Sequence, residues 1–256
     1  MKKLFCLIGF CAIVLTSCST SESASTTDEN EVLVMRTIET YANDGSTFTT
    51  NFIYNGKKLV RATDLEGYEK FTYTGDLVTL IEYFDAANTL LQTETYTYNS
   101  AGLLTSSLSL DFDFNNGIRE TYVYNTDATV SVTGFQGDLT SQTNLVRTGV
   151  ITFANGDVST YENTIESFGE TSTTTYVYDV KNNPFKNIIG FDKLKFVNSE
   201  SIRGTRNVLT QSYSSPSLTY VFSSSYTYNG LNFPTLETTI EDGSPSETET
   251  TQYFYN

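Results

Sequence analysis

The stretch "TETYTYNSAGLLTSSLSL" (residues 93–110) decides the fold of this protein. In it, Tyr96 and Tyr98 stand two residues apart between threonines, and Asn-Ser-Ala-Gly follows before the leucines begin. Side chains two apart on a strand point to the same face, so the pattern predicts a strand with one aromatic and one hydroxyl face. Asn and Gly accept positive φ at low cost, which predicts a tight reversal after the strand. The stretch therefore predicts a β-hairpin.

The same pattern recurs along the chain at a nearly constant interval. The second members of successive pairs lie 19 to 29 residues apart, except for an interval of 50 residues between Tyr178 and Tyr228. That interval is about two periods, and residues 194–202 are expected to hold a degenerate copy. A period of roughly 20–50 residues predicts a repeat protein. The pairs are Phe52/Tyr54, Phe71/Tyr73, Tyr96/Tyr98, Tyr122/Tyr124, Ile151/Phe153, Tyr176/Tyr178, Tyr226/Tyr228 and Tyr253/Tyr255.

The repeat predicts an all-β fold. A unit of about 25 residues holds two strands and two turns, so residues 32–256 are expected to form an antiparallel meander of roughly 14–18 strands. The sheet of repeated hairpins is expected to be curved or spiral, and a closed up-and-down β-barrel is the alternative. The composition agrees, since 14% of the residues are aromatic and aromatic and β-branched residues favour strands.

The N-terminus has the order of a secretory signal peptide. Lys2 and Lys3 precede an uncharged, mostly apolar run (residues 4–15), which is too short to span a bilayer. The following "LTSC" (residues 15–18) resembles the lipobox of bacterial lipoproteins, in which cleavage precedes the cysteine and that residue is lipidated. The resemblance implies a signal peptide over residues 1–17 and lipid attachment at Cys18, and an ordinary signal peptide is the alternative.

Cysteine usage favours the lipoprotein interpretation. Cys6 and Cys11 lie in the part that would be removed, so Cys18 would be the only cysteine of the mature chain. Residues 18–31 are polar, small and acidic, which predicts a flexible tether in front of the repeat domain. Their acidic, serine-rich composition also resembles an export signal of outer-membrane lipoproteins. The predicted location is the bacterial cell envelope, on an outer-membrane lipoprotein that faces the periplasm or the cell surface.

The charge balance limits the partners. The chain has 15 Lys and Arg against 30 Asp and Glu, and removal of Lys2 and Lys3 leaves 13 against 30, a net charge of −17. Such a surface repels nucleic acid and anionic lipid headgroups. The predicted contact with the membrane is therefore the lipid on Cys18, and no nucleic-acid partner is expected.

"YTYNSAGLLT" resembles the Tyr-Asp (YD) repeat of the Rhs and teneurin proteins, in which Tyr-x-Tyr-Asp-x-x-Gly-Arg-Leu units wrap into a long spiralling sheet. Asp179 and Gly102 match the Asp and Gly of that pattern, whereas Leu103 replaces its arginine. Asparagines replace the Asp at Asn55, Asn99, Asn125 and Asn229. The likeness is closest to short bacterial surface or periplasmic lipoproteins with degenerate repeats of this kind, and it implies no activity.

Few residues point to catalysis or metal binding. The chain has no histidine, which excludes Ser-His-Asp and Cys-His centres and the usual zinc sites. "DFDFNNG" (residues 111–117) places Asp111, Asp113 and Asn115 at alternate positions, but its glycine comes one place late for a calcium loop, and a strand ending in an Asn-Gly hairpin is preferred. The acids are interpreted as solvated. No enzyme, cofactor or metal is expected.

Three functions remain open. The preferred one is a non-catalytic envelope module that binds a protein or glycan partner or serves as a scaffold. A carrier of a small apolar ligand in a barrel or half-barrel lumen is the alternative, and a carboxylate-dependent hydrolase is less favoured. The tyrosine strips are expected to pack in the core because they recur in nearly every unit. Any binding site is expected in the irregular segment of residues 182–217.

Overall fold

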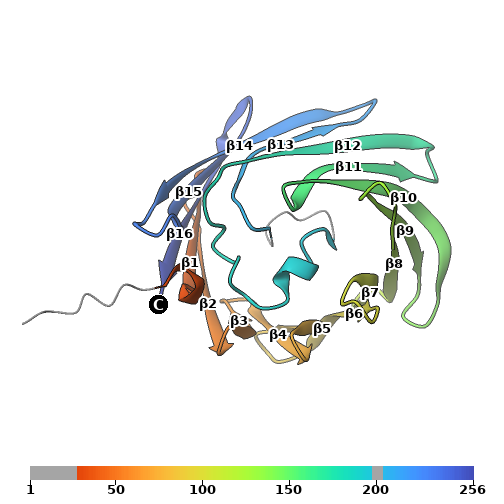
Figure 1. Ribbon diagram of the computed structural model, residues 1–256, viewed down its shortest axis with the longest axis horizontal. Helices are drawn as coiled ribbons and strands as arrows, with labels where there is room; N and C mark the ends of the chain where they lie inside the picture. The colour runs from red at the N-terminus through yellow and green to blue at the C-terminus, as the bar shows by residue number, and fades with distance from the viewer. Residues whose placement is uncertain (1–27, 198–203) are drawn as a thin grey trace, which may run out of the picture.

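The computed structural model describes residues 28–197 and 204–256, which form sixteen antiparallel strands. Each strand is hydrogen-bonded to the next one along the sequence, and the last also pairs with the first, so the sheet closes into a barrel (Figure 1). The strands are β1 (Val34–Tyr41), β2 (Thr47–Asn55), β3 (Lys58–Thr63), β4 (Gly67–Thr74), β5 (Leu77–Asp85), β6 (Leu90–Tyr98), β7 (Leu104–Asp111), β8 (Asn116–Tyr124), β9 (Val130–Gly137), β10 (Gln142–Ala154), β11 (Asp157–Ile165), β12 (Glu170–Tyr178), β13 (Val208–Ser214), β14 (Thr219–Tyr228), β15 (Pro234–Glu241) and β16 (Ser244–Tyr255).

Two short 3-10 helices accompany the strands. They are η1 (Glu29–Glu31), just before the barrel, and η2 (Phe191–Lys193), between β12 and β13. Within residues 28–197 and 204–256, no helix is long and apolar enough to cross a membrane.

The all-β antiparallel meander is confirmed, and the strand number lies within the expected range. The sheet closes as in the up-and-down alternative, so the expectation of an open curved or spiral sheet is wrong. The difference lies in β1 and β16, which pair from Arg36↔Phe254 to Tyr41↔Glu249. In an open sheet both strands would expose a row of unpaired N–H and C=O groups, and closure satisfies these groups.

The turns that follow the aromatic pairs lie at one end of the barrel, the repeat end. The remaining turns lie at the opposite end, because successive strands run in opposite directions. The β10–β11 turn shows why the repeat carries Asn and Gly: Asn155 has a φ of 52° and Gly156 a φ of 90°. A two-residue type I′ turn needs positive φ at both positions. The predicted turn chemistry is confirmed here.

Several tyrosines of the repeat tie a hairpin to its neighbour. The hydroxyl of Tyr98 on β6 donates to the carbonyl of Val78, the second residue of β5, over 2.7 Å. Equivalent bonds join Tyr54 to the carbonyl of Val34 and Tyr255 to that of Pro234, at 2.6 and 2.7 Å. Their rings face inward, as expected for core packing. The repeat thus encodes both the strand and its lateral link.

The 50-residue interval holds a segment that enters the barrel. Residues 179–197 and 204–207, the inner segment, leave β12, cross the interior and return to β13 (Figure 1). Residues 194–197 of the expected degenerate copy belong to this turn-rich segment, so the strand expected there is wrong. Residues 198–202 of that copy lie outside the described residues. The missing repeat is replaced by an internal plug.

Aromatic side chains pack the inner segment against the barrel wall. Phe191 lies 5.9 Å from Phe71 between ring centroids, and Phe185 lies 5.8 Å from Phe52. Phe196 is surrounded by the rings of Tyr122, Tyr124 and Phe153, at 5.3 to 6.5 Å. Phe191 and Phe196, with Ile188, Leu194 and Val197 of the same segment, belong to the hydrophobic core that the wall residues complete. The core therefore joins the wall to the inner segment.

Candidate functional site

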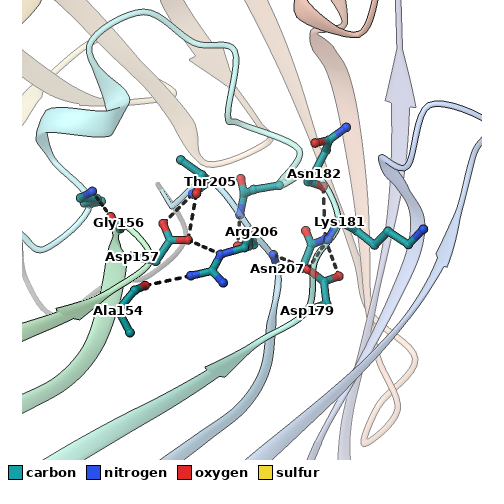
Figure 2. A network of polar contacts seen from close by, with 11 residues as sticks. Ala154, Gly156, Asp157, Asp179, Lys181, Asn182, Thr205, Arg206 and Asn207 are labelled. Atoms are coloured by element: carbon teal, nitrogen blue, oxygen red, sulfur yellow. Dashed lines mark hydrogen bonds and ion pairs between the residues drawn. The ribbon is translucent and has the colours of Figure 1, made fainter.

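A polar network holds the inner segment at the repeat end (Figure 2). Asp157, the first residue of β11, is only 1% exposed. Its carboxylate accepts hydrogen bonds from the backbone N–H and hydroxyl of Thr205 and forms an ion pair with Arg206, each at 2.8 Å. Asp157 therefore fixes the returning arm of the segment.

Asp179 fixes the departing arm in the same way. Its carboxylate accepts from the backbone and side-chain amides of Asn207 at 3.2 and 2.9 Å (Figure 2). It also accepts from the hydroxyl of Tyr228 at 2.5 Å. The Asp of the repeat pattern thus joins both arms of the segment to β14. The inner segment is held by buried polar groups as well as by its aromatic rings.

The barrel interior contains a cavity of about 400 Å³, which we call the Glu237 cavity. Its apolar lining is formed by Leu59 and by four rings, those of Phe52 and Phe71 from the wall and of Phe185 and Phe191 from the inner segment. The lining also carries carboxylates and hydroxyls, most of them from β1, β15 and β16: Thr37, Glu39, Thr50, Glu69, Glu237, Thr239, Glu249, Thr251 and Tyr253. The cavity thus combines an apolar and an acidic lining.

The strand register gathers three of these carboxylates around Thr251. On β16, Thr251 pairs with Glu237 of β15 on one side and with Glu39 of β1 on the other. Directly opposed side chains have Cβ atoms about 5 Å apart. Glu249 lies two residues before Thr251 and therefore on the same face. Closure of the barrel creates this cluster, because Glu39 is brought in by the first strand and Glu249 by the last.

Two tyrosines orient Glu237. The hydroxyls of Tyr226 and Tyr253 donate to its two carboxylate oxygens at 2.7 and 2.5 Å. Burial raises the pKa of Tyr253 well above its usual value, and the charge of Glu237 raises it further. Tyr253 therefore stays protonated and remains a hydrogen-bond donor.

The clustered acids oppose one another's ionisation. Burial raises the pKa of Glu39, and the charges of Glu249, Asp64 and Glu237 raise it further. Burial also raises the pKa of Glu249, as does the charge of Glu237. Among the described residues, none of these three glutamates pairs with Lys or Arg. The cluster has negative potential that the chain itself does not neutralise.

A second cavity, of about 310 Å³, lies against β6, β7, β8 and β10, and we call it the Arg147 cavity. Arg147 forms an ion pair with Glu120, which also accepts a hydrogen bond from the hydroxyl of Tyr122 at 2.7 Å. Gly134 makes room for this arginine, since a Cβ there would lie 2.5 Å from its Cγ. Glu94 accepts from Tyr96 at the rim of the same cavity. Here the buried carboxylates have partners in the wall.

The outer face of the barrel is rich in hydroxyl groups. On β6, Thr95 and Thr97 are exposed and alternate with the inward tyrosines, as the repeat predicts. Charged residues also face outward near the middle of the wall: Lys70 of β4 pairs with Glu82 of β5 at 2.9 Å. Glu162 of β11 is exposed beside Thr173. The wall therefore lacks a continuous apolar band over these strands.

The predicted sites have different outcomes. Cys18 lies outside the described residues. In the stretch of residues 111–117, β7 ends at Asp111, residues 112–115 form the turn and β8 begins at Asn116, so the expected strand that continues through Phe112 and Phe114 is wrong. The backbone N–H of Phe114 donates to Asp111 at 3.1 Å within this turn. Among the described residues no cluster of His, Cys, Asp or Glu could hold a metal ion. In the segment of residues 182–217, Phe185 and Phe191 do line a cavity.

The interpretation of the acids as solvated is wrong for several glutamates. Glu94 is 6% exposed and Glu120 is 3% exposed. A signal was present in the sequence, because Glu39, Glu94 and Glu120 each stand two residues before a tyrosine. That spacing places the acid on the same, inward face as the ring.

Comparisons with known proteins agree on the fold. No protein-family model and no curated protein matches this chain. A porin-like protein from Bacteroides uniformis is 15% identical with a TM-score of 0.52, over 86% of this chain and 96% of that one. A porin-like protein from Bacteroides vulgatus is 13% identical with a TM-score of 0.53, over 88% of this chain and 99% of that one. At such identities the similarity shows the barrel fold alone.

Proposed function

We propose that this protein is a lipid-anchored envelope barrel that binds a small ligand in its lumen and catalyses no reaction. The observation that carries the proposal is the Glu237 cavity, whose volume of about 400 Å³ lies within the usual range of small-molecule sites. Its lining combines four phenylalanine rings with four carboxylates, those of Glu39, Glu69, Glu237 and Glu249. The ligand is therefore not a purely apolar one.

The inner segment supports binding rather than passage. It fills the interior at the repeat end, where Asp157 and Asp179 anchor it by partly buried hydrogen bonds. A buried ion pair of this kind is costly to break. We therefore propose that the inner segment closes the lumen at the repeat end, so that the barrel is not a conducting pore.

The outer wall supports a barrel that stands in water next to the membrane. Barrels that span a bilayer carry an outward apolar band flanked by aromatic girdles, and a Lys or Arg at mid-depth costs about 2–4 kcal/mol. Here Lys70 and Glu82 lie near the middle of β4 and β5, and exposed threonines occupy the same face of β6. In this proposal the lipid on Cys18 holds the protein on the membrane.

A change of anchor tests the location. We would replace residues 1–17 with a cleavable non-lipoprotein signal peptide, together with Cys18→Ser, and fractionate the cells. The expected result is release of the folded barrel into the soluble fraction, while the unaltered chain stays with the membranes. A barrel that remains embedded after this change, and that resists alkaline extraction, would contradict the proposal.

A further inference from the structure

The Glu237 cavity also indicates the chemical class of its ligand, an inference that rests on the proposed lumenal binding. Its lining has two parts: the rings of Phe52, Phe71 and Phe191 belong to the apolar part, whereas Glu39, Glu237 and Glu249 belong to the acidic part. A ligand that fills the cavity must satisfy both. Such a ligand has an apolar part and a group that complements negative charge.

The Arg147 cavity provides an internal comparison. There the buried carboxylate of Glu120 is neutralised by Arg147 of the wall. In the Glu237 cavity, by contrast, no described Lys or Arg pairs with Glu39, Glu237 or Glu249. Clustered carboxylates away from bulk water disfavour their own ionisation unless a cation joins them. The carboxylates of this cavity therefore complement a positive charge, of the kind that Arg147 supplies to Glu120.

A bare metal ion does not suit these carboxylates. Among the described residues, no three acidic side chains converge closely enough to hold a metal. The three glutamates instead surround Thr251 on three adjacent strands, and Glu237 is held in its orientation by Tyr226 and Tyr253. That spacing matches a larger cation with several N–H donors, and aromatic rings attract such cations through their faces.

We infer that the Glu237 cavity binds an organic cation, a protonated amine or guanidinium that carries an apolar group. The cationic head donates to Glu39, Glu237 and Glu249, and the apolar group packs against Phe52, Phe71 and Phe191. Two features besides charge support this assignment: the cavity has the volume of a small-molecule site, and the inner segment supplies a ring surface inside it.

Isothermal titration of the purified full chain with three probes of similar shape tests the inference: 2-phenylethylamine, 2-phenylethanol and 3-phenylpropionate. We expect the amine to bind about tenfold or more tightly than the alcohol, because charge-assisted hydrogen bonds are about twice as strong as neutral ones. The acid should not bind measurably.

The variant Glu39→Gln/Glu249→Gln keeps the shape of the cavity and removes two charges. It should weaken amine binding about tenfold or more and leave alcohol binding unchanged. Glu162→Gln, on the outer wall, is the matched control and should change neither. Thermal unfolding of each variant reports whether the barrel has folded.

The outcomes separate the inference from the proposed function. Equal binding of amine and alcohol, or amine binding that Glu39→Gln/Glu249→Gln does not weaken, would overturn the cation inference and leave lumenal binding standing. If none of the probes binds, and native mass spectrometry of protein extracted from its own envelope shows the bare mass, both are overturned. A co-purified adduct identified as an amine or guanidinium compound, and lost on Glu39→Gln/Glu249→Gln, would support both.

Discussion

The hairpin wall and the inner segment solve the same problem, burial of apolar surface, in different ways. The wall repeats one short pattern, and tyrosine hydroxyls recurrently link a hairpin to the one before it, as Tyr98 does with Val78 and Tyr54 with Val34. The inner segment has no repeat and depends on individual contacts, such as those of Asp157 with Arg206. In the wall a lost contact has many equivalents, whereas in the inner segment it has none. A single substitution should therefore lower the free energy of unfolding slightly in the wall and strongly in the inner segment.

The largest effect is expected at the anchor of the inner segment. Asp157→Ala should lower the free energy of unfolding by about 3–5 kcal/mol, because it leaves the guanidinium of Arg206 without its buried partner. The matched control is Asp76→Ala, also in a repeat-end turn, whose exposed ion pair with Lys58 contributes about 1 kcal/mol or less. Urea unfolding of both variants measures the difference. Equal losses would show that the segment does not depend on Asp157.

The next effect is expected in the core of the segment. Phe196→Ala should cost about 3 kcal/mol, since it opens a cavity among Tyr122, Tyr124 and Phe153. Phe168→Ala is the control, because this ring is 75% exposed in a turn and its loss should cost less than about 0.5 kcal/mol. The same urea titration compares the two. A small loss for Phe196→Ala would mean that the wall is stable without the segment's packing.

A smaller effect is expected within the wall. Tyr98→Phe removes one hydroxyl link and should cost about 1 kcal/mol, since the carbonyl of Val78 loses its donor. The control is Tyr213→Phe, whose ring stacks on Tyr220 at 4.7 Å and should retain that contact. If Tyr98→Phe cost as much as Asp157→Ala, the wall would be no more redundant than the segment.

The smallest effect is a dependence on pH. Burial raises the pKa of Glu39 in the folded barrel, and the charges of Glu249, Asp64 and Glu237 raise it further. Burial and then the charge of Glu237 raise the pKa of Glu249. A carboxyl whose pKa rises on folding stabilises the protein below its unfolded pKa, and that stability is lost as the pH rises through the folded pKa. Glu69 and Tyr253 face the same cavity.

Thermal unfolding between pH 4 and pH 7 checks this dependence. The unaltered barrel should gain stability as the pH falls from 7 toward the raised pKa values. Glu39→Gln/Glu249→Gln should be more stable than the unaltered barrel at pH 7, and its stability should change less over that interval. An unaltered barrel that only loses stability on acidification would contradict the prediction.

Sequence patterns reveal the wall but not the inner segment, for a physical reason. The wall's strands follow from a period of two, and Asn155-Gly156 specifies its own turn, so local chemistry is sufficient there. Closure depends on the pairing of Thr37 with Tyr253, which no local pattern reveals. Likewise Phe196 finds its partners on β8 and β10, strands distant in sequence. The spacing to tyrosine marks Glu39 as inward-facing but not Glu237 or Glu249, each of which stands two residues before a threonine, and the cavity between them exists only after closure.

Closure of the barrel depends on contacts between residues that lie nearly a whole chain length apart in sequence. The backbone N–H of Leu33 donates to the side chain of Asn256 at 2.9 Å, across a sequence separation of 223 residues. Contacts of such separation form slowly, because a long loop must close before they are gained. Until β16 has been synthesised, β1 has an open edge and the Glu39 half of the cavity has no opposite half. A chain that ends before β16 therefore keeps the unpaired N–H and C=O groups of β1, which can pair with strands of other chains. The Glu237 cavity is likewise complete only after β16 has paired with β1.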